Sequence, residues 1–468
     1  MLKDFEFNLN KWHLLLILII GFLATFFSFV VTAIWVIAIV FCLIGVFKKN
    51  CFIYVWYTIA MSPGLEIWGR MAKAPAIPWE IGKYFLFVVI IAMLFGNWEK
   101  RPLYKVGVYL IIAILPSLVI ALINLPFNFE NWLMHAAGIL QIGILLLYTS
   151  RERISKINFI KILKISIIPI IPIVEYITIK TPKFNDVDFK LVANSQTTGG
   201  FGSNQVSTIL GLGILILSIL IFTKQFLFIN NKFDYVLLFY FFFRGLLTFS
   251  RGGILSAVIA IIICSLILFW GNKRSIYRAL KYSTLILFIG FFVAFFANKL
   301  TNNQLSLRYK GETEGTASGT REKTLNTITS SRSTIAETDI DIFLDHLLYG
   351  VGPGESQNFR EQYGGAKIIA HVEYSRLLSE HGIGGLFVIV ILTFFPFYWV
   401  KRIKERESKA IAAALFTFAI LNSFHAAMRT NATTTCYIIA AIPLFINIPK
   451  ILGSNKKEIL VPDIINNA

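Results

Sequence analysis

The chain is dominated by long apolar stretches that follow one another with only short polar segments between them. Of its 468 residues, 56% are hydrophobic and only 15% are charged, and the mean hydropathy is +0.69. A soluble domain carries roughly 25% charged residues, so this chain has too little polar surface to stay in water. The composition disfavours a soluble enzyme, a nucleic-acid-binding protein or a disordered chain, and it favours a polytopic membrane protein.

A helix that crosses a membrane needs about 20 apolar residues, with a lower limit of roughly 17. The apolar stretches predict an all-α, polytopic membrane helix bundle with about 14 transmembrane helices. The expected spans lie near residues 14–29, 30–47, 51–62, 82–97, 103–123, 132–149, 165–179, 206–222, 235–249, 254–270, 283–298, 384–400, 410–427 and 434–448.

The net charge of +18 comes from 44 Lys and Arg against 26 Asp and Glu. Basic residues collect in the cytoplasmic loops of membrane proteins, which explains this excess better than a nucleic-acid partner does. Every second loop is basic, as in Lys273 to Lys281 and Lys401 to Lys409, whereas residues 124–131 contain neither Lys nor Arg. This alternation predicts an even number of spans with both termini in the cytoplasm.

One segment, residues 299–383, is much longer than the other loops, and the alternation places it outside the cytoplasm. The chain thus divides into N-terminal spans (1–298), a large extracytoplasmic loop (299–383), and C-terminal spans with a cytoplasmic tail (384–468). Within the loop, residues 311–333 are rich in Thr, Ser and Gly and are expected to be irregular. Thr334 and Glu337 have the spacing of a capping box, which predicts a helix over 335–348. A second helix is expected to start near Ala370.

Charged residues at membrane depth indicate function by default. Arg244 lies within an apolar span, and Arg251 follows seven residues later in Ser250-Arg251-Gly252-Gly253. Seven residues are almost two helical turns, so both side chains are expected to point the same way, about 10 Å apart along the axis. Two guanidinium groups on one face suit a lipid diphosphate. Snorkelling to the interface, or pairing with a buried acid, is the structural alternative for both.

Arg332 precedes the helix expected over 335–348. A guanidinium beside the positive end of a helix forms an anion site, although a solvated loop arginine is the simpler interpretation. Four acids follow in this helix: Glu337, Asp339, Asp341 and Asp345. Acids are favoured in the first turns of a helix in any case, so we expect no metal site and no cofactor.

His371 lies beside the entrance of the twelfth span, where a histidine can act as general base on a sugar hydroxyl. A lone histidine is more often structural, and Glu373 or Glu380 could act as the base or orient His371. Arg376 in the same segment and Arg429 between the last two spans are further candidates for binding an anionic substrate. The other five histidines, His425 among them, show no comparable context.

Three motifs resemble the O-antigen polymerase and ligase family of bacterial membrane glycosyltransferases, and they occur in that family's order. The first is Thr248-Phe249-Ser250-Arg251-Gly252-Gly253. The second is Ser331-Arg332, followed after a helix by His346-Leu347-Leu348-Tyr349-Gly350-Val351-Gly352-Pro353-Gly354. The third is His371, followed by Glu380-His381-Gly382-Ile383-Gly384-Gly385-Leu386. The family usually has Asn after the histidine, where this chain has Val372. The resemblance covers about residues 195–400.

This resemblance implies a metal-independent transferase that uses undecaprenyl-diphosphate-linked glycans at the outer face of the bacterial cytoplasmic membrane. The family's two catalytic arginines and its histidine map to Arg251, Arg332 and His371. Arg244, Arg429, Glu373 and Arg376 are candidates for binding the substrate. The implied partners are the lipid-linked glycan, the lipid bilayer, and other polysaccharide export and chain-length proteins.

Two reactions fit this family, and a third function competes with both. A polymerase joins repeat units into O-antigen or capsule, whereas a ligase transfers the finished glycan to a lipid A core of lipopolysaccharide or to a protein acceptor. Fourteen spans without an additional C-terminal domain favour the polymerase. A transporter of lipid-linked oligosaccharides would need paired repeats of broken helices, and no repeat is evident.

Overall fold

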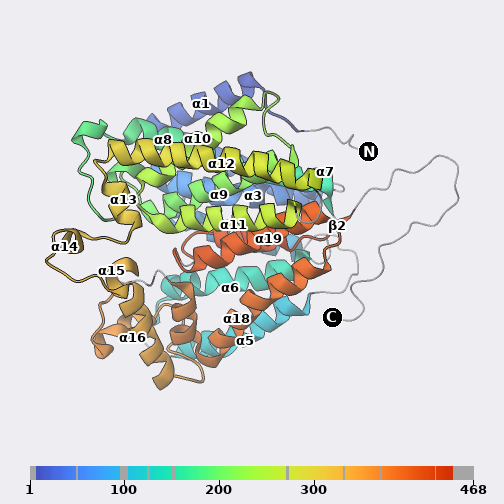
Figure 1. Cartoon of the computed structure of the whole chain (residues 1–468). Helices are drawn as coiled ribbons and strands as arrows, with labels where there is room; N and C mark the ends of the chain where they lie inside the picture. Colours follow the sequence, from blue (N-terminus) through green and yellow to red (C-terminus); the bar gives the residue numbers. More distant parts are fainter. Residues whose placement is uncertain are drawn as a thin grey trace, which may run out of the picture.

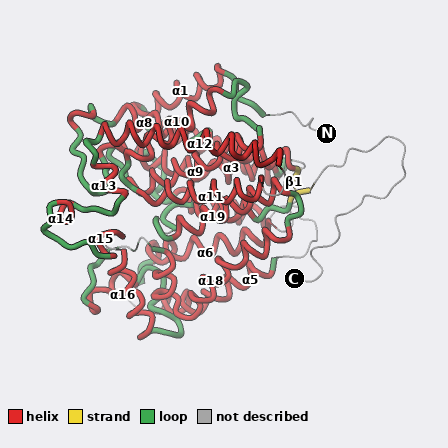
Figure 2. Tube along the Cα trace, viewed as in Figure 1, coloured by secondary structure: helices red, strands yellow, loops and turns green. Residues whose placement is uncertain are grey.

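The computed structural model describes residues 7–48, 51–94, 104–123, 127–149, 154–269, 273–329, 332–368, 370, 372–426 and 428–445. Most of these residues are helical, and the long helices lie side by side along one direction (Figures 1 and 2). The only sheet among them is a pair of two-residue parallel strands, β1 (Ile154–Ser155) and β2 (Leu444–Phe445). The prediction of an all-α membrane protein is confirmed.

Within the described residues, the bundle consists of fifteen helices that are apolar over most of their length. They are α1 (Lys11–Phe26), α2 (Phe29–Phe47), α3 (Ile53–Ala72), α4 (Ile81–Leu94), α5 (Lys105–Ile123), α6 (Phe129–Thr149), α7 (Lys156–Ile167), α8 (Ile170–Lys180), α9 (Ser203–Thr223), α10 (Lys232–Leu247), α11 (Arg251–Phe269), α12 (Lys273–Leu300), α18 (Glu373–Arg402), α19 (Arg406–Ser423) and α20 (Ala432–Ala440).

Shorter helices connect α12 to α18 and α8 to α9. Between α12 and α18 lie α13 (Gln304–Tyr309), α14 (Glu314–Ala317), α15 (Leu325–Thr329), α16 (Arg332–Asp345), α17 (Ser356–Phe359) and the 3₁₀ helix η3 (Arg360–Tyr363). Between α8 and α9 lie the 3₁₀ helices η1 (Phe184–Asp186) and η2 (Gln196–Thr198).

Every predicted span overlaps one of the bundle helices, with α7 and α8 together corresponding to the seventh. Within the described residues, eight helical stretches are long and apolar enough to cross a membrane. They are Phe29–Phe47, Lys105–Ile123, Phe129–Thr149, Lys156–Lys180, Ser203–Thr223, Arg251–Phe269, Ser283–Leu300 and Glu373–Arg402. The total of fourteen crossings therefore remains a prediction.

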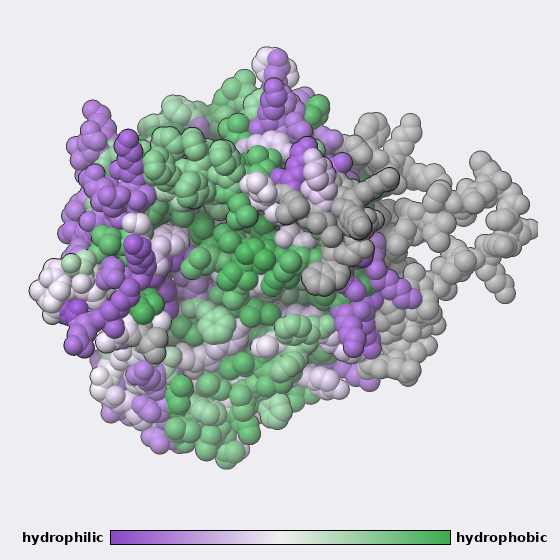
Figure 3. Space-filling model, in the orientation of Figure 1, coloured by the Kyte–Doolittle hydropathy of each residue, from purple (hydrophilic) through white to green (hydrophobic). Residues whose placement is uncertain are grey.

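The two ends of the bundle differ. The strands β1 and β2 lie at one end near α7, and the short helices α13 to α16 gather at the opposite end (Figure 1). A broad hydrophobic face lies between the ends, and hydrophilic residues cover the end that carries the short helices (Figure 3). This distribution fits a bundle that crosses a bilayer along its long direction.

Helix α9 forms the centre of the bundle, since 94% of its most apolar 18-residue stretch is buried. It crosses α11 at two glycines, because a Cβ at Gly253 would lie 2.3 Å from the carbonyl oxygen of Ser207. A Cβ at Gly211 would lie equally close, at 2.3 Å, to the carbonyl oxygen of Gly253. Only glycine allows this close backbone approach. The first turn of α11, which carries Arg251, is thereby fixed against the core of the protein.

The expectation that Arg244 and Arg251 share one helix face is wrong. Helix α10 ends at Leu247 and α11 begins at Arg251, with Phe249 between them in a left-handed conformation at φ 56°. The hydroxyl of Thr248 accepts a hydrogen bond from the amide of Ser250 at 3.1 Å, which stabilises this turn. Because the helix is interrupted, seven residues no longer correspond to two turns of one face.

The segment between α12 and α18 also differs in detail from the sequence prediction. Helix α16 begins at Arg332 rather than near Ile335 and ends at Asp345, so the spacing of Thr334 and Glu337 does not mark its start. Residues 311–333, expected to be irregular, contain α14 and α15. Helix α18 begins at Glu373 and bends at Gly382, whose φ is 58°.

Candidate functional site

Three arginines converge where α11, α13 and α16 meet. Arg251 donates hydrogen bonds to the carbonyl oxygens of Arg308, at 3.1 Å, and of Ile328. Burial, together with repulsion from Arg251 and Arg332, lowers the pKa of the Arg308 guanidinium to about 10. Burial and then repulsion from Arg251 likewise lower the pKa of Arg332. Guanidinium groups that weaken one another's protonation in this way form a site suited to an anion.

Two buried polar atoms at this cluster have no hydrogen-bond partner among the described residues. They are the hydroxyl oxygen of Tyr309 and Nε of Arg332. Arg251 and Arg308 lie close enough to Tyr309 to oppose the rise in its pKa that burial causes. Buried polar groups are normally hydrogen-bonded. Because these two can both donate, they favour a ligand with acceptor oxygens at the cluster.

His425 connects two of the elements that carry these arginines. Its Nδ1 and its carbonyl oxygen each lie 3.5 Å from Nη2 of Arg332, and its Nε2 lies 3.3 Å from the hydroxyl of Ser250. The ring lies directly against the backbone of α11, because a Cβ at Gly252 would be 2.1 Å from its Cγ. Gly252 therefore has a packing role that the motif alone did not reveal.

The segment that follows His425 is held by two buried glutamates from distant parts of the chain. Glu373 of α18 accepts a hydrogen bond from the amide of Met428 at 3.0 Å, and Glu66 of α3 accepts one from the amide of Asn431 at 2.9 Å. Arg70 of α3 donates to the carbonyl oxygen of Arg429 at 3.3 Å. Residues 428–431 are thus fixed from both sides.

Glu373 and Arg376, two predicted substrate-binding residues, belong to a separate buried ion cluster. Arg376 forms ion pairs with Glu373 and Glu380, whose side chains are 1% and 0% exposed. His135 of α6 lies 3.3 Å from Glu380, and Ser356 donates to the same carboxylate at 3.0 Å. This cluster joins α6, α17 and α18, so its arrangement indicates a structural role for Arg376.

The remaining predicted site residues are placed differently. Arg244 donates to the carbonyl oxygens of Ile177 and Thr197, at 2.8 and 3.3 Å, and thereby joins α10 to the α8–η2 region. Burial, together with repulsion from Arg376 and Arg332, lowers the pKa of Arg429, and attraction to Glu80 opposes this decrease. Arg429 thus lies near both charged clusters. His371 falls outside the described residues, and Val372 gives α18 an N-cap without a side-chain hydrogen bond.

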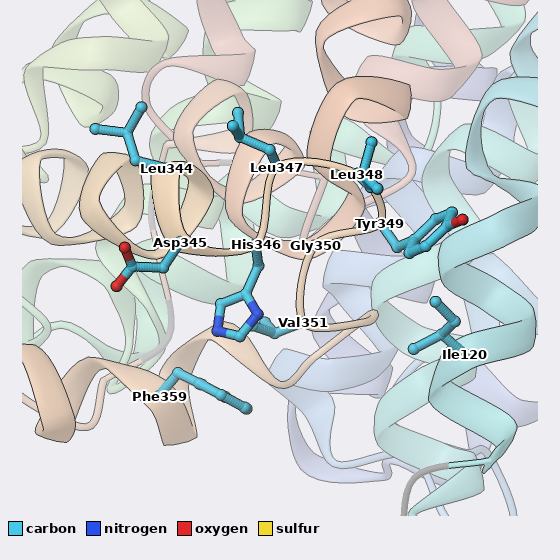
Figure 4. A pocket seen from close by; sticks show the side chains of 10 residues that line it. All are labelled: Ile120, Leu344, Asp345, His346, Leu347, Leu348, Tyr349, Gly350, Val351 and Phe359. Atoms are coloured by element: carbon cyan, nitrogen blue, oxygen red, sulfur yellow. The ribbon is translucent and has the colours of Figure 1, made fainter.

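The second sequence motif forms an open cavity of about 460 Å³ at the C-terminal end of α16 (Figure 4). Its lining is mainly apolar, and the ring of His346 meets Phe359 edge-on at a centroid distance of 5.4 Å. The turn that contains Val351 and Gly352 packs on α18, because the amides of these two residues donate hydrogen bonds to the carbonyl oxygens of Ser379 and Glu380, each at 3.0 Å. Arg332 and this cavity lie at opposite ends of α16, and a helix of this length spans about 20 Å. The cavity is therefore separate from the arginine cluster.

Two of the four acids of α16 are engaged in other contacts. Asp339 pairs with Arg360 at 2.7 Å and accepts a hydrogen bond from Ser375 at 2.7 Å, and Asp345 accepts one from Tyr363 at 2.7 Å. Within the described part of the chain, no three His, Cys, Asp or Glu side chains are grouped so that they could hold a metal ion.

Sequence reasoning missed Arg308, Tyr309 and His425. Arg308 stands in Leu305-Ser306-Leu307-Arg308-Tyr309, which matches no motif, and His425 follows an apolar run without any neighbouring charge. Their contacts with Arg251 and Arg332 join residues 57 and 93 positions apart. Local spacing carries no signal for contacts of this range.

One comparison with known proteins bears on this site. Residues 235–390, which run from α10 to the bent part of α18 and contain all three clustered arginines, match the family model described as O-antigen ligase. No curated protein sequence matches the chain. The match and the apolar helices together imply a multi-pass protein of the bacterial inner membrane that acts as a glycosyltransferase of the O-antigen ligase or polymerase type on a lipid-linked glycan. The match of residues 235–390 to the O-antigen ligase family model thus confirms the resemblance drawn from the motifs.

Proposed function

We propose that the chain polymerises undecaprenyl-diphosphate-linked oligosaccharide repeat units into a surface polysaccharide, O-antigen or capsule, without a metal ion. The observation that carries this proposal is the convergence of Arg251, Arg308 and Arg332 within the O-antigen ligase segment. A lipid diphosphate offers several acceptor oxygens, and guanidinium groups bind such oxygens with paired hydrogen bonds.

The proposed reaction transfers a glycan from the lipid diphosphate to an acceptor hydroxyl. The bond between the sugar's anomeric carbon and the phosphate oxygen breaks, and a bond from that carbon to the acceptor oxygen forms. Negative charge grows on the leaving diphosphate, where Arg251, Arg308 and Arg332 stabilise it. His371 takes the proton of the acceptor hydroxyl. Arg429 adds positive charge nearby, whereas Glu373 and Arg376 support the site through the segment that contains Met428.

The proposed orientation puts α13 to α16 outside the cytoplasm, where a lipid-linked glycan would be polymerised. Cysteine in place of exposed Ser318, between α14 and α15, should therefore react with an impermeant maleimide in intact cells. Three native cysteines, Cys42, Cys264 and Cys436, are buried, and a Cys51→Ser background removes the partly exposed fourth. Mass-tagging of the protein on a gel measures the labelling.

The matched control for this experiment is cysteine in place of exposed Lys404, between α18 and α19. It should react only after the cells are permeabilised, because the basic segment there is expected in the cytoplasm. Labelling of the Ser318→Cys variant only after lysis would show that the proposed orientation is wrong, and it would contradict a reaction at the outer face of the membrane.

A ligase is the second candidate, because the matching family model is described as O-antigen ligase. The glycolipid profile of a deletion strain separates the two reactions. Loss of the polymerase leaves single repeat units on the acceptor, which is the result we expect. Loss of a ligase leaves full-length chains on undecaprenyl diphosphate. An unchanged profile would contradict both functions.

A further inference from the structure

We propose that His425 is a positioning residue that sets the orientation of Arg332 in the diphosphate site. This inference rests on the proposed function of the arginine cluster, but it concerns a residue outside the matched segment 235–390. His425 belongs to the connection between α19 and α20, far in sequence from Arg251, Arg308 and Arg332.

The hydrogen bonds around His425 form one consistent arrangement. A guanidinium group can only donate, so Nδ1 of His425 accepts from Arg332 across their 3.5 Å contact. The ring hydrogen is then on Nε2 and points to the hydroxyl of Ser250 at 3.3 Å. Ser250 in turn donates to Oδ1 of Asn204 at 2.8 Å. From this network we assign the neutral tautomer, with the ring hydrogen on Nε2.

The ring also fixes the distance between two elements that carry the arginines. On one side it lies against Gly252, directly after Arg251 in α11, and on the other side it meets Arg332 at the start of α16. Because any side chain at position 252 would overlap the ring, glycine there is required for the contact. His425 thereby acts as a spacer between the two proposed phosphate-binding groups.

The backbone around His425 is held firmly enough for this role. Its own amide donates to the carbonyl oxygen of Asn422 at 2.9 Å, and the Asn422 side chain bonds Thr208 of α9 and Thr433 of α20, at 3.0 and 2.8 Å. Further along, Glu373 fixes the amide of Met428. A positioning residue needs such supporting contacts, because small displacements weaken a preorganised site.

His425 is not placed to act as the general base. Its side chain is only 4% exposed, and both ring nitrogens face groups of the protein, Arg332 and Ser250. A base must reach the acceptor hydroxyl directly or through one water molecule. The proton-accepting role therefore stays with His371 in the proposed mechanism, and His425 acts through Arg332.

The test compares two isosteric variants of His425 in the purified full-length protein. In His425→Asn the amide oxygen replaces Nδ1 and can still accept from Arg332, whereas His425→Gln places its amide near Nε2 and loses that acceptor. Binding of undecaprenyl diphosphate in lipid nanodiscs is the readout. We expect the Kd of His425→Gln to rise about 10-fold, as for other coupled contacts, and that of His425→Asn to stay within about threefold of wild type.

A double-mutant cycle shows whether the effect passes through Arg332. His425→Gln should weaken binding no further in an Arg332→Ala background. Gly252→Ala, which displaces the ring, should weaken binding as His425→Gln does. Equal binding by wild type and His425→Gln would overturn the positioning role alone, as would additive losses in the cycle. Absence of undecaprenyl diphosphate binding by the wild type would instead overturn the proposed function and this role with it.

Discussion

Replacing Arg251 or Arg332 by alanine is expected to abolish glycan chain formation while the amount of protein in the membrane stays near normal. Loss of one preorganised donor to a developing charge lowers the rate by roughly 10²- to 10³-fold. Arg251 starts α11 and Arg332 starts α16, and both donate hydrogen bonds mainly to carbonyl oxygens of neighbouring segments. Such bonds from a charged group contribute about 1.5–3 kcal/mol each to folding, and removing one guanidinium also removes its repulsion of the others in the cluster, which offsets part of that loss.

Two further variants make this experiment specific. Arg251→Lys keeps the charge but loses the planar set of donors, so it should be impaired as well. Arg321→Ala removes an exposed arginine between α14 and α15 and should leave the glycan unchanged. Polymer length and yield, measured at equal membrane abundance, give the result. Wild-type polymer from Arg251→Ala would show that the arginine cluster does not bind the diphosphate.

Replacing Arg376 by methionine is expected to reduce the amount of folded protein, whereas the Arg251 and Arg332 variants are expected to lose activity at a near-normal amount of protein. Glu373 and Glu380 would both remain buried without the guanidinium that pairs with them. Breaking a buried pair from one side costs about 3–5 kcal/mol. The thermal unfolding of the purified protein in detergent should move to markedly lower temperature, and the amount in the membrane should fall.

A second-site change provides the control for Arg376. Adding Glu380→Gln to Arg376→Met removes one of the two uncompensated carboxylates, so part of the lost stability should return. A substrate-binding role for Arg376, as predicted from its place in the same segment as His371, implies normal stability with lost activity. Normal unfolding of Arg376→Met would therefore favour substrate binding over the structural role.

The helical architecture could be predicted from the sequence because it follows from the length and composition of apolar stretches. Each stretch must satisfy its own backbone hydrogen bonds in a membrane, and a helix does this locally. The break between α10 and α11 was misplaced for a physical reason. The expected spans 235–249 and 254–270 put it at residues 250–253, but Gly252 and Gly253 lie within α11 and allow close packing, and the turn uses Phe249 with a left-handed backbone.

The site could be predicted only where it coincides with a motif. Arg251 and Arg332 stand in recognisable surroundings, and the structure places both near Arg308. Arg244 looked functional because a charge in an apolar span carries the same signal whether it binds a ligand or a buried partner, and Arg376 because it stands in the same segment as His371. The difference lies in their neighbours, the carbonyl oxygen of Ile177 for Arg244 and the carboxylate of Glu380 for Arg376. The contact with Ile177 is too distant in sequence to be predicted from local spacing. Glu380 is close in sequence, but a carboxylate there is compatible with either a structural ion pair or a binding site.

The two glutamates that hold residues 428–431 also affect the order in which the protein can be completed. Glu66 and the amide of Asn431 are 365 residues apart. A ribosome adding roughly 5–20 residues per second needs about 20 to 70 s to synthesise the chain between them. During that time Glu66 can be neutralised within its own helix, because Arg70 stands four residues later and reaches it at 2.5 Å. Helix α3 can thus enter the bilayer during translation, while the segment that carries His425 docks only near the end of synthesis.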